Sequence, residues 1–326
     1  MSIDTSKLTF IFQGPVINKT EFKKSINSVR KFFPKSKIIL STWKGQNFDT
    51  LDVDHLLLND DPGPGPYDSL NNKIRKNNIN RQLISTLNGL KNVKTIYSIK
   101  IRTDLFFTSD NLLNLLMNIE KIKNDFFFKS KIIVLSDFSM NPQRKNTLFL
   151  NPSDWIYAGL TCDLLDLFTI PQSSKKELLW FKDYSFKKKG NYKNNNKNFN
   201  LAPRFTPEQY ILVKYLNKKN LGNEIEDAFD EYHLSFFHNS FLFDNFLMYN
   251  YRSLGIQSFK YNLSIFLDLS KSYTEKEFIK KNSNYYFDKN RIFSNFINLI
   301  KKYCPKIIFQ FLKKIYLFCK TYFENY

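Results

Sequence analysis

Cysteine, histidine and glycine are scarce in this sequence, which contains three, three and nine of them among 326 residues. Cys162, Cys304 and Cys319 are far apart and form no CxxC pair, which argues against a disulfide framework and against a zinc site. The histidines are too few and too scattered to indicate a histidine-rich metal site. Isolated cysteines are typical of proteins in a reducing cytosol. Because glycines are so few, we expect them to lie at turns rather than in flexible linkers.

Long apolar runs are also missing. No window approaches about 18 uninterrupted apolar residues, so we expect no membrane-spanning helix. The N-terminal sequence MSIDTSKLTFIFQG lacks a basic stretch followed by an apolar segment, so we expect no signal peptide and a cytoplasmic protein. The common motifs GxGxxG (after the first strand), GxxxxGK[ST], HExxH and GxSxG are absent as well, which excludes the functions that they mark.

Acidic residues are fewer than basic ones: the chain contains 30 Asp and Glu and 49 Lys and Arg, which gives a net charge of +19. This charge favours an anionic partner: a nucleotide, nucleic acid, a phosphorylated sugar or an anionic membrane surface. Hydrophobic residues make up 42% and aromatic residues 17% of the chain. Such a composition supports a buried core and excludes wholesale disorder.

Predicted strands and helices alternate along the first third of the chain. Apolar runs predict buried strands, and apolar residues at helical spacing predict helices, the first of them capped by Thr20. This alternation is typical of an α/β fold with a mostly parallel sheet covered on both faces. The expected strands are 8–12, 37–42, 55–58 and 95–101, and the expected helices are 20–33 and 79–90.

The second half of the chain is less regular. We expect a helix at 111–119, a strand at 131–135, a turn leading into a strand over 151–159, and a helix at 208–216 opened by Pro207. The basic, Asn-rich segment 187–200 is predicted to be a loop. After His238 we expect an irregular aromatic segment followed by a basic tail.

Polar or turn-forming residues follow four of the predicted strands. Ligands of open α/β sheets bind beyond the carboxyl ends of the strands, so these residues are candidates for one cleft. They are Gln13, Gly14 and Pro15; Ser41, Thr42, Trp43 and Lys44; Asp60 and Asp61; and Arg102, Thr103 and Asp104.

Seven segments in order resemble the WavE lipopolysaccharide-synthesis family of bacterial glycosyltransferases: FIFQGPVI, KIILSTWKG, LNDDPG, NINRQLISTLNGL, IKIRTDLFF, PSDWIYAG and TPEQY. The resemblance covers roughly residues 8–245. It implies a glycosyltransferase A-like fold with a nucleotide-sugar-binding half at 1–110, an acceptor half at 111–245, and a C-terminal extension at 246–326.

The resemblance also implies a metal-binding carboxylate after a central strand. Asp104 stands at this position, where it would hold Mn²⁺ or Mg²⁺ on the donor diphosphate, or where it would simply cap a helix. Arg102 occupies the place of the first Asp in the usual DxD pattern. A guanidinium there can hold the diphosphate directly, which puts an obligatory metal in doubt.

Further donor-binding candidates lie at the other strand ends and at the start of the helix 79–90. Arg81, beside Asn80, would neutralise phosphate, or would be a solvated surface charge. Trp43 would stack on the donor base, or would cover the core, while Ser41 and Thr42 would contact the nucleotide through their hydroxyl groups. Asp60 and Asp61 would touch the ribose or base, or would stabilise their Pro- and Gly-rich turn. Gln13, Gly14 and Pro15 complete the predicted nucleotide-sugar site.

An inverting transferase needs a carboxylate that takes the proton of the acceptor hydroxyl. Two candidates are Asp154 in PSDW and Glu208 in TPEQY. For Asp154 the alternative is a turn-stabilising role, and for Glu208 it is an interaction with the dipole of its helix.

The C-terminal residues 289–323 contain basic but no acidic side chains. Segment 305–323 predicts an amphipathic helix, whose apolar face carries Ile308, Phe311, Leu312, Ile315, Cys319 and Tyr322. Such a helix would lie on the anionic inner-membrane surface, or would pack on the catalytic domain with its lysines in water.

From these observations we expect a cytoplasmic, membrane-associated glycosyltransferase. It would move a sugar from a nucleotide-sugar donor to a lipid-linked or oligosaccharide acceptor, as in growing lipopolysaccharide, lipooligosaccharide or capsule. One alternative is a sugar-phosphate transferase on the same scaffold. A nucleic-acid-binding protein is the other, although no RNA-binding signature or zinc-finger spacing supports it and we expect no nucleic-acid partner.

Overall fold

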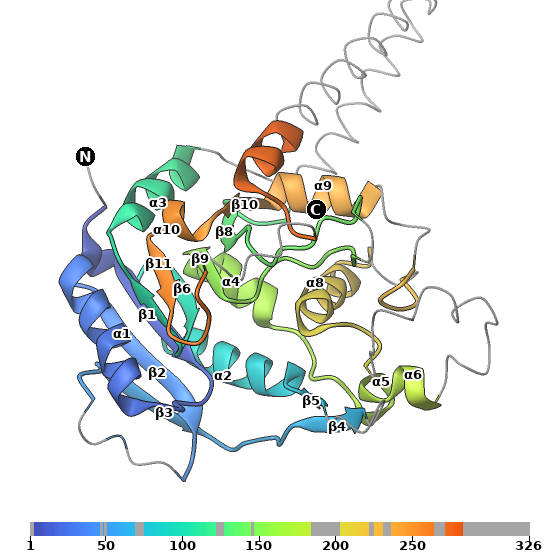
Figure 1. Cartoon of the computed structure of the whole chain (residues 1–326), viewed down its shortest axis with the longest axis horizontal. Helices are drawn as coiled ribbons and strands as arrows, with labels where there is room; N and C mark the ends of the chain where they lie inside the picture. The colour runs from blue at the N-terminus through green and yellow to red at the C-terminus, as the bar shows by residue number, and fades with distance from the viewer. Residues whose placement is uncertain are drawn as a thin grey trace, which may run out of the picture.

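The computed structural model of the chain is shown in Figure 1. It describes residues 3–45, 48, 51–68, 75–121, 127–144, 147–183, 203–221, 225–230, 236–263 and 271–282. The predicted loop at 187–200 and the predicted tail helix at 305–323 lie outside these ranges.

A seven-stranded sheet in the order β10-β8-β9-β6-β1-β2-β3 forms the centre of the molecule. Neighbouring strands are parallel except at β9, which runs antiparallel to both β6 and β8. The predicted mostly parallel α/β sheet flanked by helices is therefore confirmed. Its strands are β1 (Leu8–Gln13), β2 (Lys37–Trp43), β3 (His55–Asn59), β6 (Tyr97–Arg102), β8 (Ile132–Leu135), β9 (Ile156–Leu160) and β10 (Phe246–Tyr249).

Helices cover both faces of this sheet (Figure 1). Successive side chains of a strand point to opposite faces, so Phe10 and Phe12 of β1 enter one core while Ile11 enters the other. The first core contains side chains of α1 (Lys19–Phe32) and α3 (Asn111–Lys121). The second contains side chains of α2 (Ile79–Lys91), α4 (Thr161–Phe168), α8 (Pro207–Lys218) and α9 (Phe236–Asn245).

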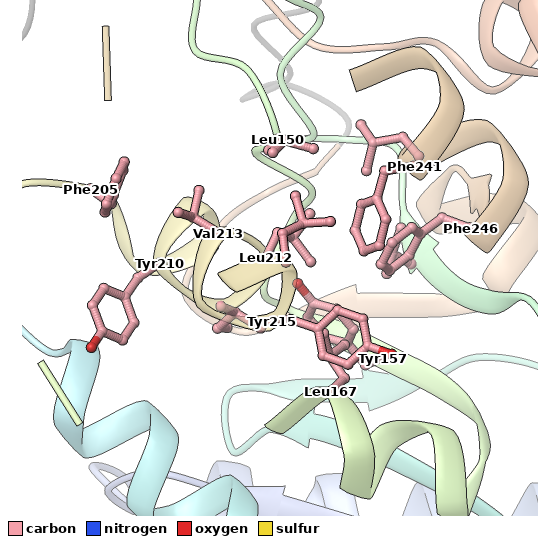
Figure 2. Close-up of a cluster of buried hydrophobic side chains, with 14 of the residues drawn as sticks. Leu150, Tyr157, Leu167, Phe205, Tyr210, Leu212, Val213, Tyr215, Phe241 and Phe246 are labelled. Atoms are coloured by element: carbon pink, nitrogen blue, oxygen red, sulfur yellow. The ribbon is translucent and has the colours of Figure 1, made fainter. Parts of the chain in front are cut away.

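The second core joins segments that are far apart in the sequence. Figure 2 shows Tyr157 of β9 and Leu167 of α4 beside Tyr215 of α8, with Phe241 and Phe246 close by. The Tyr215 ring stacks on Phe128 with ring centroids 5.0 Å apart. This packing holds α8 against the sheet.

Smaller elements complete the described fold. β4 (Gly65–Asp68) pairs with β5 (Arg75–Asn77), and β7 (Leu105–Phe107) pairs with β11 (Ile256–Ser258), both antiparallel. The remaining elements are a short 3₁₀ helix η1 (Thr5–Lys7) and the short helices α5 (Lys175–Leu178), α6 (Trp180–Asp183) and α10 (Tyr251–Leu254).

The structure corrects two sequence predictions. The N-cap of α1 is Asn18 rather than Thr20, because the Asn18 side chain accepts hydrogen bonds from the backbone N–H groups of Thr20 and Glu21. The segment after His238 is not irregular: it belongs to α9 and then to β10, which pairs with β8. The central sheet thus continues past residue 245, the expected end of the catalytic domain. Within the described residues, no helix is both long and apolar enough to cross a membrane.

Gly89 sets the distance between α2 and the sheet. A Cβ at this position would lie 2.3 Å from Cγ2 of Ile11, a buried β-branched side chain of β1. We expect Gly89→Ala to reduce the free energy of unfolding by about 1–2 kcal/mol, because an overpacking cost of about 2–3 kcal/mol outweighs the gain of about 1 kcal/mol in helix propensity. Urea unfolding measures this change, with Lys91→Ala on the exposed side of the same helix as the control. Equal or higher stability of Gly89→Ala would show that α2 moves away from β1 at little cost.

Candidate active site

The carboxyl ends of the parallel strands open into a cavity of about 840 Å³. Gln13 ends β1 and is the register partner of Arg102, which ends β6, so the two residues are neighbours at this edge. Because β9 is antiparallel, its beginning lies at the same edge and brings Asp154 to the cavity. Eight of the predicted site residues line it: Gln13, Gly14, Pro15, Trp43, Arg81, Arg102, Asp104 and Asp154.

Arg102 and Asp104 form a bidentate ion pair at the end of β6. Arg102 Nε donates to Asp104 Oδ1 at 2.9 Å, and Nη2 donates to Oδ2 at 2.5 Å. The guanidinium also lies 4.9 Å from the ring centroid of Trp155. Burial is the largest single influence and opposes the charge of Arg102, but the hydrogen bonds to Asp104 together with the negative charges of Asp104 and Asp154 outweigh it and raise the pKa of the guanidinium. Arg102 is therefore a fixed positive charge at the cavity wall.

The geometry of Asp104 bears on the predicted metal site. Both of its carboxylate oxygens already accept hydrogen bonds from Arg102. The described residues contain no group of three or more His, Cys, Asp or Glu side chains that could hold a metal ion. Because Arg102 already engages both oxygens of Asp104, we derive no reaction step through a divalent cation. The metal-ligand role of Asp104 stays a prediction.

For the nucleotide-sugar donor predicted from the sequence, we expect turnover to continue at a comparable rate in EDTA, because Arg102 would supply the positive charge that a metal would otherwise provide. The measurement is nucleotide release from the donor with EDTA and with added Mn²⁺. A loss of activity in EDTA that Mn²⁺ restores in the native protein, but not in Asp104→Asn, would instead assign the metal to Asp104.

Three charged side chains meet where β6, the start of β9 and the start of α8 converge. Lys100 is fully buried in β6, and its Nζ donates to the backbone carbonyl of Asp154. Glu208 is in the first turn of α8, after the N-cap Thr206. Burial, followed by the negative charge of Asp154, raises the pKa of Glu208 to about 7. Burial lowers the pKa of Lys100 to about 8, although the charges of Asp154 and Glu208 oppose this shift.

Only one of the two predicted bases reaches the cavity wall. Asp154 lines the cavity together with Thr206 and Pro207, whereas Glu208 is not among the described lining residues. Asn151 Nδ2 donates to Thr206 Oγ1 at 2.6 Å and so ties the segment before β9 to the start of α8. The arrangement makes Asp154 the accessible carboxylate, with Glu208 and Lys100 as its charged neighbours.

The loop after β1 forms another part of the wall. Gly14 has a φ of +99°, a conformation that favours glycine. Thr103 Oγ1 donates to the carbonyl of Pro15 at 2.7 Å and joins this loop to the end of β6. Ser85 of α2 donates to Gln13 Oε1 at 2.9 Å. These contacts hold the β1 loop between β6 and α2.

Arg81 of α2 also lines the cavity. Its Nε and Nη2 donate to the two carboxylate oxygens of Asp61 at 2.7 and 2.6 Å, which lowers the pKa of Asp61. Asp61 Oδ1 also accepts from the backbone N–H of Gly63, as expected for a turn-stabilising aspartate. Asp61 therefore positions Arg81, as Asp104 positions Arg102.

Five predicted donor-binding residues do not line the cavity: Asp61, described above, and Ser41, Thr42, Asp60 and Asn80. Ser41 and Thr42 are buried in β2, and Asn59 Nδ2 donates to Ser41 Oγ at 3.0 Å. The strongly exposed Asp60 pairs with Lys44. Asn80 exchanges two hydrogen bonds with the backbone of Ser173, and so joins α2 to the chain before α5.

Sequence reasoning missed several residues at this site. Lys100 was visible as the one charge inside the apolar segment TIYSIKI, which is an unusual place for an ammonium group. Asn77, Gln82, Phe259 and Lys260 line the cavity, but no local pattern distinguishes them from ordinary polar or aromatic residues.

Comparison with protein families finds one match. A family model described as WavE lipopolysaccharide synthesis matches residues 8–317. A search of curated proteins finds no match.

Several solved structures are similar over about half of this chain. A cytidylyltransferase from Leptospira borgpetersenii matches 52% of this chain and 67% of its own, with 10% identity and a TM-score of 0.32. The 4-diphosphocytidyl-2C-methyl-D-erythritol synthase of Anaerococcus prevotii matches 53% and 83%, with 12% identity and a TM-score of 0.30. TarS of S. aureus in complex with UDP-GlcNAc matches 52% and 51%, with 12% identity and a TM-score of 0.31. At these TM-scores the likeness carries no argument about substrate.

Proposed function

This chain belongs to the WavE lipopolysaccharide synthesis family, and from that premise we propose that it is a glycosyltransferase that uses a nucleotide-sugar donor. The family match confirms the resemblance of the seven ordered segments. The observation that carries the proposal is one cavity with a fixed guanidinium, Arg102, and an accessible carboxylate, Asp154, both at the carboxyl edge of the sheet.

Arg102 is suited to bind the diphosphate of the donor. Arginine has five N–H groups, and the ion pair with Asp104 uses one N–H of Nε and one of Nη2, along one edge of the guanidinium. The remaining N–H groups can donate to phosphate oxygens, with a charge that does not vary over the physiological pH range. As the bond from the anomeric carbon to the diphosphate breaks, negative charge grows on the leaving oxygen, and Arg102 stabilises it.

Asp154 is suited to act as the general base. In a direct displacement, the acceptor oxygen bonds to the anomeric carbon while its proton passes to a carboxylate and the nucleoside diphosphate departs. Asp154 lines the cavity, so an acceptor hydroxyl can reach it. The hydrogen bond from Lys100 to the Asp154 carbonyl holds the backbone that carries this carboxylate.

The proposed acceptor is a growing surface glycan, in keeping with the lipopolysaccharide synthesis of the family description. We retain lipooligosaccharide and capsule as further acceptors of the same chemical kind. Association with the inner-membrane surface stays a prediction, because the tail on which it depends lies outside the described residues.

A donor screen tests the proposal. The full chain is incubated with UDP-, GDP-, CMP- and dTDP-sugars, and the released nucleotide is identified by chromatography. We expect release of the intact nucleoside diphosphate or, from a CMP-sugar, CMP. Release of UMP or GMP from a diphosphate-linked donor would identify a sugar-phosphate transferase. Absence of both binding and turnover with every donor would contradict the proposal.

A further inference from the structure

Two side chains from beyond residue 245, the expected end of the catalytic domain, line the cavity. They are Phe259 and Lys260, which directly follow β11. β11 pairs with β7, and the backbone N–H of Phe259 donates to the carbonyl of Asp104 at 3.0 Å. The hydroxyl of Ser258 accepts the backbone N–H of Lys260 at 3.2 Å. The turn that carries both side chains is therefore fixed beside the end of β6.

An aromatic contact of Tyr261 places this turn next to the proposed base. Its ring centroid lies 5.4 Å from that of Trp155, the residue that follows Asp154 in the chain. β9, which begins directly after Trp155, lies on one side of β6 in the sheet. β1 and β2, which carry Gln13 and Trp43 of the predicted donor site, lie on the other side. The turn is thus on the side of β6 where an acceptor, rather than a nucleoside, would meet the base.

Lys260 differs from the other basic side chains that line the cavity. Arg81 and Arg102 are each held by an aspartate. Lys260 is exposed and has no ion pair within the described part of the chain, and its Nζ lies 5.0 Å from the ring centroid of Tyr261. An ammonium group donates three hydrogen bonds and accepts none, and it binds charged oxygens about twice as strongly as neutral ones. An accessible, unpaired ammonium in the cavity wall therefore favours a ligand with an anionic group.

Phe259 supplies an apolar surface beside this charge. Its half-buried ring stacks on Phe106, with ring centroids 4.4 Å apart and an angle of 27° between the ring planes. Phe106 covers one face of the ring and holds it in place, and Phe259 lines the cavity with its remaining surface. The face of an aromatic ring is electron-rich and attracts C–H groups, which carry a small positive charge. A pyranose presents such C–H groups on one face, so it fits this ring better than a phosphate does.

We propose that Phe259 and Lys260 form an acceptor subsite that selects a sugar with an anionic substituent. Phe259 supports the pyranose ring, and Lys260 binds the phosphate or carboxylate group that the ring carries. The inference rests on the proposed function, because it assigns the sugar that receives the transferred residue. It also places acceptor recognition in the chain after residue 245 rather than in residues 111–245.

Saturation-transfer NMR with the full chain tests this subsite. The probes are glucose 6-phosphate, glucuronic acid and the uncharged methyl β-glucoside, each titrated to obtain a Kd. We expect one or both anionic sugars to bind about three- to tenfold more tightly than methyl β-glucoside, as for an accessible ionic contact. The tighter of the two shows whether phosphate or carboxylate is preferred.

Lys260→Gln is expected to abolish the preference for the anionic sugars. Lys31→Gln is the matched control and should retain it. Lys31 is also exposed, and its Nζ lies 4.9 Å from the ring centroid of Phe32, but it is on α1 and is not among the described lining residues. Binding of inorganic pyrophosphate, the probe for the site at Arg102, should be the same in Lys260→Gln as in the native protein.

Phe259→Leu is expected to weaken the binding of all three sugars about fivefold, because leucine keeps an apolar side chain but lacks the aromatic face. Phe259→Tyr keeps this face and should bind them as the native protein does. A purely structural role of Phe259 would not distinguish the charged sugars from pyrophosphate, whose binding should be unchanged in Phe259→Leu.

The outcomes separate this inference from the proposed function. Equal binding of charged and uncharged sugars, no detectable binding of any of them, or a preference that survives in folded Lys260→Gln would overturn the subsite and leave a nucleotide-sugar transferase in place. Loss of pyrophosphate binding in Lys260→Gln would assign Lys260 to the donor and would also overturn it. If the donor screen finds neither binding nor turnover, the proposed function itself fails, whichever sugars bind.

Discussion

Arg102→Lys is expected to lower kcat/KM for the donor by about 10²–10³-fold, the loss typical of removing one preorganised donor to a developing negative charge. Lysine keeps the positive charge. Its single ammonium group, however, cannot bind both oxygens of Asp104 and contact a diphosphate at the same time, as the guanidinium can. We expect kcat to fall and KM to rise, because the guanidinium contacts the donor both before and during bond breaking. Steady-state kinetics with saturating acceptor measures both constants.

Arg30→Lys is the matched control for this prediction. Like Arg102, Arg30 is paired with carboxylate oxygens, in its case those of Asp52 and Asp54, and its side chain is 26% exposed, compared with 23% for Arg102. It lies on α1 outside the cavity lining, so its replacement is expected to leave the kinetics unchanged. Near-native activity of Arg102→Lys would remove Arg102 from the diphosphate site.

Asp104→Asn tests the coupling between the two residues. If Asp104 acts by positioning Arg102, kcat/KM of the double variant Arg102→Lys/Asp104→Asn should be hardly lower than that of Arg102→Lys alone, because both substitutions disturb the same ion pair. If the fold-losses of the two single variants instead multiply in the double variant, Asp104 has a separate role, such as holding a metal.

Lys100→Met is expected to reduce kcat about 10²-fold at pH 7 with little change in donor KM, because Lys100 is a positioning residue that does not line the cavity. Its ammonium holds the Asp154 carbonyl and offsets the negative charges of Asp154 and Glu208. Without this positive charge the ionised form of Glu208, whose pKa is about 7, becomes less favourable. A carboxyl NMR titration should therefore show Glu208 titrating at higher pH than in the native protein.

Lys131→Met separates this effect from general damage to the core. Lys131 is also buried, has a pKa lowered by burial to about 8, and donates to a backbone carbonyl, that of Phe243 at 2.7 Å. It does not line the cavity, so kcat and the titration of Glu208 should be unchanged. Native kcat and an unchanged titration of Glu208 in a folded Lys100→Met variant would exclude the proposed role of Lys100.

Residues close together in the chain were sufficient to predict the local elements and the edge of the sheet that carries the cavity. Apolar runs and helical spacing depend on neighbouring residues, so they located β1, β2, β3, α1 and α2 closely. The rule that ligands bind beyond the carboxyl ends of parallel strands then selected Gln13, Trp43, Arg102 and Asp104, which all line one cavity.

The neighbours of these residues in the cavity depend on the tertiary structure. The antiparallel pairing of β9 with β6 brings Asp154 beside Arg102, and the packing of α8 brings Glu208 close to Lys100. The aromatic segment after His238 became α9 and β10 because of its contacts with β8 and α8, which local spacing does not encode. Whether the Nε2 group of Gln82 has a hydrogen-bond partner likewise depends on residues that are distant in the sequence. Residue types and spacing therefore predicted candidates, whereas long-range packing set their partners, burial and charge.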